Sequence, residues 1–220
     1  MNRRISYRAL AAIAFLGGVL ALILLAQSLV TGVSQEAFEM VIPVDRYADR
    51  LVSQAGGLRF AFTIDFLFIG CFTSFFVLFG AALRDEADRW VVAVAVGAMV
   101  LTGLLDAIED THILSMLASA SMGRAPAAGE IQWQSWASAT KFFASYSGLF
   151  LFSFALTRTT RWESWLRLSL RYLQFPIGAL ALTAAGGLVR PVLLIRALFY
   201  VAGFLLAALT CLDRARRPAG

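Results

Sequence analysis

A short segment of the chain gathers side chains that can exchange protons or bind cations. The sequence "TGLLDAIEDTHILSM", residues 102–116, contains Asp106, Glu109, Asp110 and His112, the only histidine of the chain. Carboxylates and imidazoles act as general acids and bases, hold metal ions and relay protons. The residues on either side are almost all apolar, so the segment combines ionisable groups with a sequence able to enter lipid.

The spacing of these groups predicts that they share one face of a helix. At ~100° per residue, Asp106, Glu109 and Asp110 fall in one stripe, and His112 lies at its edge. Ionisable residues interrupt other apolar segments at a similar predicted depth, and such residues cost at least ~2.5–3.5 kcal/mol inside a membrane without a partner, a cavity or a task. We therefore predict one outward-opening polar pocket lined by Asp65, Asp106, Glu109, Asp110, His112, Lys141, Arg196 and Tyr200.

The composition indicates an integral membrane protein. Of the 220 residues, 60% are hydrophobic and 15% are charged, whereas a soluble domain is about half apolar and about a quarter charged. The apolar residues form blocks of roughly twenty, enough to cross ~30 Å of hydrocarbon as helices. We predict an all-α six-transmembrane-helix bundle forming a single domain, residues 1–220, with spans at about 8–30, 58–83, 91–116, 135–157, 170–188 and 192–212.

The distribution of basic residues predicts the orientation of the bundle. Twelve arginines fall on the side of the termini and five on the other side, and positive charge favours the cytoplasm. We expect both termini to be cytoplasmic and the loops 31–57, 118–133 and 189–191 to face outward, in the plasma (inner) membrane of a bacterium-like cell. The first block is too long for a signal-peptide core and is predicted to remain as a helix. The net charge of +5 comes largely from arginines at block ends, so the expected partner is the lipid bilayer and not nucleic acid.

Two amphipathic segments lie outside the predicted membrane-crossing blocks. Residues 43–57 place apolar side chains at helical spacing opposite aspartates and arginines, which predicts a short helix on the outer surface between the first two spans. Residues 160–175 carry Trp162, Trp165 and Tyr172, which are typical anchors at a membrane interface. We assign no further role to the second segment.

Three functions remain compatible with the predicted pocket. The favoured one is binding or transport of a cation, a proton or a small amine-bearing or lipid-like ligand, because four acids face only two bases. In the second, the protein is a membrane-embedded enzyme acting on a lipid head group. In the third, Lys141 and Arg196 neutralise acids and fix helix register in an accessory subunit of a membrane complex.

The sequence leaves open whether the protein is an enzyme and whether it binds a divalent metal. His112, Glu109 and Asp106 could ligate one, and oxygen-rich ligands suit Mg²⁺, Ca²⁺ or Mn²⁺ better than Zn²⁺. The chain has no nucleophile elbow, phosphate-binding glycine loop or His-Glu-x-x-His motif. Six spans are few for a transporter acting alone, so a homodimer or a larger membrane complex is a plausible assembly.

Overall fold

The computed structural model describes residues 6–157, 160–183 and 189–216, which form helices and connecting segments without a β-strand. The elements in chain order are α1 (Tyr7–Thr31), the 3₁₀ turn η1 (Gln35–Phe38), α2 (Val44–Ser53), α3 (Ala55–Leu83), α4 (Arg89–Ser121), α5 (Ala128–Ala155), α6 (Arg161–Leu168), the π-helix η2 (Ser169–Gln174), α7 (Phe175–Thr183) and α8 (Val189–Ala215).

Four helices of the described chain are long and apolar enough to cross a membrane: α1, α3, α4 and the segment Pro191–Ala215 of α8. The protein is therefore all-helical and suited to a membrane. Helix α5 is also long, but its buried face carries Gln134, Ser138, Lys141 and Ser145. This polar face makes α5 less apolar than the other four, so length and composition alone do not identify it as a span.

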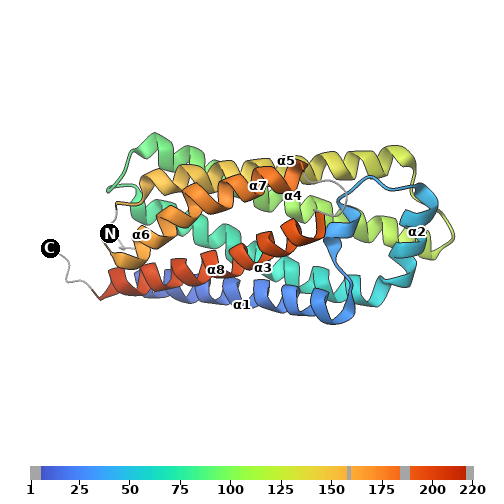
Figure 1. Cartoon of the computed structure of the whole chain (residues 1–220), viewed down its shortest axis with the longest axis horizontal. Coiled ribbons are helices and arrows are strands. Elements are labelled where there is room, and N and C mark those ends of the chain that lie inside the picture. The colour runs from blue at the N-terminus through green and yellow to red at the C-terminus, as the bar shows by residue number, and fades with distance from the viewer. Residues whose placement is uncertain (1–5, 158–159, 184–188, 217–220) are drawn as a thin grey trace, which may run out of the picture.

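The long helices run lengthwise through one elongated bundle, and α2 lies across one end (Figure 1). Helices α1 and α8 pack against each other, α3 lies against α1 and α4, and α4 lies against α5. Tyr7, near the start of α1, bonds to Arg214, near the end of α8, so the chain begins and ends at one end of the bundle. We call this the terminal end, and we call the opposite end, which carries α2 (Figure 1), the α2 end.

Local signals explain where the helices begin and end. Gly32 closes α1 with φ of 69°, a left-handed conformation that favours glycine, and Gly123 follows α4 with φ of 77°. The Asp88 carboxylate accepts the Trp90 and Val91 amide hydrogens and caps the start of α4. The Glu130 carboxylate accepts the Ala127 amide hydrogen at the start of α5.

One expectation about the last third of the chain changes. Residues 189–191, expected as an outward loop, already belong to α8, whose first turn accommodates Pro191 because a proline there removes no helical hydrogen bond. Pro176 does not interrupt its helix. The run from Arg161 to Thr183 is continuous, and the π-helix η2 ends at Gln174, two residues before the proline. Residues 184–188, the end of the predicted fifth span, lie outside the described residues.

The apolar core forms two clusters, one toward each end. The larger one contains the phenylalanines of α3 together with Phe152 of α5 and Phe204 of α8. The second lies beneath α2, where Phe38, Tyr47 and Leu51 pack against α3 and α4. Most of the predicted site residues lie between these clusters, toward the α2 end.

Candidate functional site

The connection between α1 and α2 carries two glutamates into the bundle. The Ser34 hydroxyl accepts the Glu36 amide hydrogen and caps η1. Phe38 is fully buried, its ring meets that of Tyr47 edge-on at 5.3 Å, and the Tyr47 hydroxyl donates to the Phe38 carbonyl at 3.1 Å. Because Phe38 is anchored in this way, the flanking residues Glu36 and Glu39 are held against side chains of α5 and α8.

Lys141 of α5 contacts three carboxylates. Its Nζ lies 2.8 Å from Asp106 Oδ1, 3.0 Å from Glu109 Oε2 and 3.4 Å from Glu39 Oε1. Asp106 and Glu39 accept hydrogen bonds from the ammonium, whereas Glu109 is close but not aligned to accept one. Lys141 and Glu109 are both buried. One ammonium thus ties α5 to α4 and to the η1 segment.

Arg196 of α8 makes the second set of ion pairs. It donates to Glu36 Oε1, and its Nη2 lies 3.7 Å from Glu39 Oε2. The guanidinium also lies over the Phe142 ring of α5 at 4.0 Å, and the Lys141 ammonium is 4.5 Å from the same ring. Both cations of the site are therefore engaged by carboxylates and by one aromatic face.

Three aspartates form the most acidic part of the site. Asp65 of α3 and Asp106 and Asp110 of α4 each offer an oxygen, and these three oxygens lie within 4.8 Å of one another. Asp65 accepts a hydrogen bond from Gln35 at 2.9 Å. Asp110 is fully buried and neither of its oxygens has a hydrogen-bond partner. Among the described residues, no lysine or arginine lies within 4.0 Å of Asp65 or Asp110.

A cavity of about 590 Å³ lies beside these groups. Asp65, Asp106, Lys141, Arg196 and Tyr200 line it, so five of the eight residues predicted to share a pocket do so. Glu109 and Asp110 lie behind that wall, in contact with or close to its members. The rest of the wall includes the η1 segment and the apolar side chains Leu24, Leu25, Leu29, Leu193, Leu194 and Ala197.

His112 lies apart from the three aspartates. Its Nδ1 is 2.7 Å from Gln134 Oε1, and its ring meets Trp133 edge-on at 4.9 Å. The predicted metal ligands His112, Glu109 and Asp106 are not the group that the structure spaces for a metal; that group is Asp65, Asp106 and Asp110. It contributes oxygen ligands alone, which suit Mg²⁺, Ca²⁺ or Mn²⁺.

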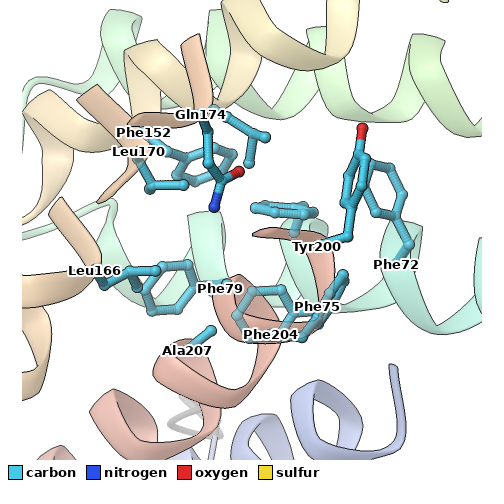
Figure 2. Close-up of a pocket in the computed structure, with 13 residues that line it drawn as sticks. Phe72, Phe75, Phe79, Phe152, Leu166, Leu170, Gln174, Tyr200, Phe204 and Ala207 are labelled. Carbon is cyan, nitrogen blue, oxygen red and sulfur yellow. The ribbon is translucent and has the colours of Figure 1, made fainter. Parts of the chain in front are cut away.

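A second, smaller cavity of about 30 Å³ lies on the terminal side of the first. Figure 2 shows its phenylalanine lining, with the Gln174 amide pointing into it. Phe72 and Tyr200 line both cavities, and the Tyr200 hydroxyl is 3.3 Å from Ser145 Oγ. These two rings therefore separate the polar cavity from the apolar one.

The sequence interpretation missed Gln35, Glu36 and Glu39, which complete the site from a connecting segment. Their signal was present, since "SQEAFE" places two acids and an amide around an aromatic residue in the first outer loop. Helical spacing could not align them with α4, because the segment is not part of a long helix. Only the burial of Phe38 shows where they point.

The interpretation also missed an ion-pair network at the terminal end. The Arg214 guanidinium donates to Glu163 Oε1 at 2.8 Å and Oε2 at 3.1 Å, to Glu86 Oε2 at 2.8 Å and to the Tyr7 hydroxyl at 2.9 Å. Glu163 is fully buried. Residues 160–175 thus supply a buried carboxylate, and α6 is bound to α8.

Comparisons of the chain with protein-family models, with curated proteins and with solved structures found no match.

Proposed function

We propose that the protein binds a cationic ligand, an amine-bearing molecule in the first instance, in an outward-facing cavity inside the membrane. One observation carries this proposal: Asp65, Asp106 and Asp110 bring three carboxylates together beside a cavity of about 590 Å³. Like charges at this separation repel strongly in a medium of low dielectric. A bound cation relieves that repulsion, and the cavity has room for an organic one.

The charge balance of the whole site supports a cation over an anion. Six carboxyl groups surround two basic side chains, and both basic side chains already pair with acids. Among the described residues, the acids of the site without a basic partner within 4.0 Å are Asp65 and Asp110. An anion would have to compete with Glu36, Glu39 and Asp106 for Lys141 and Arg196. The six acids, by the elements that carry them, are Glu36 and Glu39 near η1, Asp65 on α3, and Asp106, Glu109 and Asp110 on α4.

We also propose that six helical runs cross the membrane, with α5 and the continuous run α6–η2–α7 joining the four apolar helices. The polar face of α5 is turned into the bundle, where Gln134, Ser138, Lys141 and Ser145 are buried, so its remaining surface can meet lipid. The excess of arginine near the terminal end favours cytoplasmic termini. A thiol reagent that cannot cross membranes should label a cysteine at Gly123, beside the α2 end, in intact cells but not one at Asp85.

Binding of an alkylammonium probe to the protein in phosphatidylcholine nanodiscs tests the proposed function. Isothermal titration should show binding of n-hexylammonium, and much weaker binding of the uncharged 1-hexanol. Asp65→Asn should weaken n-hexylammonium binding at least tenfold, about 1.4 kcal/mol. Asp49→Asn, which changes an exposed acid of α2, is the matched control. Equal binding of the alcohol, or unchanged binding by Asp65→Asn, would contradict the proposal.

A divalent metal ion is the second candidate ligand, favoured by the oxygen spacing of the three aspartates. Elemental analysis of the purified protein, and titration with Mg²⁺, Ca²⁺ and Mn²⁺, separate it from the amine. Metal that disappears in Asp65→Asn, together with no response to n-hexylammonium, would support this candidate. If neither class of cation binds, the ion pairs of Lys141 and Arg196 act only as braces between helices.

A further inference from the structure

Helices α1 and α8 touch closely near their middles. Gly17 and Gly18 of α1 face Phe204 and Leu205 of α8, and a Cβ added at Gly17 would lie 2.9 Å from the Phe204 ring. The absence of a side chain at Gly17 therefore permits the close approach. The two helices pack from this point toward the terminal end, where Tyr7 meets Arg214.

Toward the α2 end, the same two helices are separated by the large cavity. Leu25 and Leu29 of α1 line it on one side, and Leu193 and Leu194 of α8 line it on the other. Figure 1 shows the two helices diverging in this direction. We call this space, between residues 21–29 and residues 193–197, the α1–α8 cleft.

The α1–α8 cleft opens on the side of the bundle. Leu29 is 63% exposed and Leu194 is 40% exposed, yet both also line the cavity. A residue that is exposed on the outside of the bundle and also lines the cavity marks the rim of an opening. Both helices have the length and composition of membrane spans, so the opening faces hydrocarbon in the proposed topology. Asp65 of α3 and Asp106 of α4 line the same cavity.

From this arrangement we infer that the ligand is an amphiphile that enters from the surrounding leaflet through the α1–α8 cleft. Its cationic head lies at Asp65 and Asp106, which line the cavity in front of Asp110, and its hydrocarbon chain extends along the leucines of α1 and α8. The carboxylates of Asp65 and Asp106 match the cationic head of such a molecule, and the leucines of α1 and α8 match its chain, while Arg196 on the same stretch of α8 is already paired with Glu36 and Glu39. This inference rests on the proposed function and adds the chemical class of the ligand and its route.

Two probes of different chain length test the inference. In nanodiscs, with each affinity referred to the free aqueous concentration of the probe, n-dodecylammonium should bind the wild-type protein more tightly than n-butylammonium, with a gain of up to about fourfold per methylene removed from water. Ala197→Trp narrows the cleft, and it should weaken n-dodecylammonium binding at least tenfold while leaving n-butylammonium binding within about threefold. Leu198→Trp, beside it on α8 but outside the cavity lining, is the matched control.

A labelling experiment on the unmodified chain provides a second test that does not depend on the folding of a variant. A dodecylammonium derivative with a diazirine at its tail should label peptides containing residues 21–29 or 193–197. Excess n-dodecylammonium should suppress that labelling. Labelling confined to other helices, or equal binding of both probes with no effect of Ala197→Trp, would overturn the cleft inference. If neither probe binds at all, the proposed cation-binding function itself is wrong. This outcome differs from binding without involvement of the cleft, which would overturn the cleft inference alone.

Discussion

Lys141 Nζ lies 2.8 Å from Asp106 Oδ1, and this contact joins the two helices whose polar faces form the centre of the site. The same ammonium also contacts Glu109 and Glu39. It is the only lysine of the chain. The Lys141 ammonium thus offsets part of the negative charge that the acids of the η1 segment, α3 and α4 bring to the site.

Removal of the Lys141 charge should destabilise the protein strongly. Lys141→Met leaves three carboxylates without their shared cation, and breaking a buried ion pair in this way costs about 3–5 kcal/mol. Thermal unfolding in nanodiscs measures the loss. Arg59→Met, at an exposed arginine of α3, serves as the control. The double variant Lys141→Met with Asp106→Asn should regain part of the stability, and a further loss there would contradict this account.

Neutralising Asp110 should have the opposite effect on stability. Its carboxyl is buried and has no hydrogen-bond partner, beside the oxygens of two other aspartates. Asp110→Asn replaces a carboxyl group beside two other carboxylates with an amide that can donate a hydrogen bond to one of them, and we expect a gain of about 1.5–3 kcal/mol, the range for a hydrogen bond to a charged group. The same change should weaken alkylammonium binding. Thermal unfolding without ligand tests the first effect, with the exposed Asp45→Asn as control, and reduced stability would show that the carboxylate is required.

The hydrogen bond of Tyr47 should contribute to stability in a pH-dependent way. Tyr47→Phe loses the bond to the Phe38 carbonyl, at a cost of about 1 kcal/mol. Burial raises the pKa of Tyr47, and the nearby Glu109 and Glu39 raise it further. The folded state disfavours the phenolate form of Tyr47. The contribution of neutral Tyr47 to the free energy of unfolding is therefore complete below the ordinary tyrosine pKa of about 10, and it declines as the pH rises above that value.

Unfolding temperatures measured between pH 8 and pH 11 test this expectation. The gap between wild type and Tyr47→Phe should be largest near pH 8 and should narrow above about pH 10. The exposed Tyr172→Phe should show no such change across the range. If the difference in unfolding temperature between wild type and Tyr47→Phe widened with rising pH, the expected direction of the pH dependence would be wrong.

The close packing of α4 and α5 should make Gly148 intolerant of a side chain. A Cβ there would lie 2.5 Å from Met99 Sδ, 3.1 Å from Ala98 Cβ and 3.3 Å from the Ala95 carbonyl oxygen. Gly148→Ala should cost about 1–3 kcal/mol through overpacking. Gly97→Ala, in α4 with no neighbour within 4 Å, should be neutral or slightly stabilising. Similar unfolding temperatures for both variants would contradict the expected contact.

The bidentate geometry of Arg214 should not be replaceable by a lysine. Arg214→Lys keeps the charge but cannot reach Glu163, Glu86 and Tyr7 together, since an ammonium lacks the planar fork. We expect a loss of about 2–4 kcal/mol, comparable with losing hydrogen bonds to a buried charge. Arg216→Lys, at an exposed position, is the control. Equal stability of the two variants would show that charge alone suffices at residue 214.

Much of the fold was accessible from periodicity and composition. The apolar blocks predicted α1, α3 and α4 to within a few residues at most ends, because membrane helices need long uninterrupted apolar runs. The stripe of Asp106, Glu109 and Asp110 could be predicted because helical spacing fixes which side chains share a face. The π-turn before Pro176 could not be predicted, because it depends on how α7 packs against α5 and α8.

The candidate site was predictable only where it lies on long helices. Asp65, Asp106 and Lys141 were found because each is a charge within an apolar run. Glu36 and Glu39 were not found, since an acid in a polar loop is ordinary until a buried neighbour shows that the loop enters the bundle. The Arg214 network was missed for a related reason: a charge near a helix end normally meets water or lipid headgroups.

The position of Arg214 in the last helix has a consequence for how the chain is made. Tyr7, Glu86 and Glu163 all leave the ribosome before Arg214, so their contacts with it form only once α8 has been synthesised and inserted. Helix α1 packs extensively against α8, so this packing also forms only after α8 and the helices between them have been synthesised. Chains truncated before residue 189 should therefore lack both this packing and the Arg214 contacts.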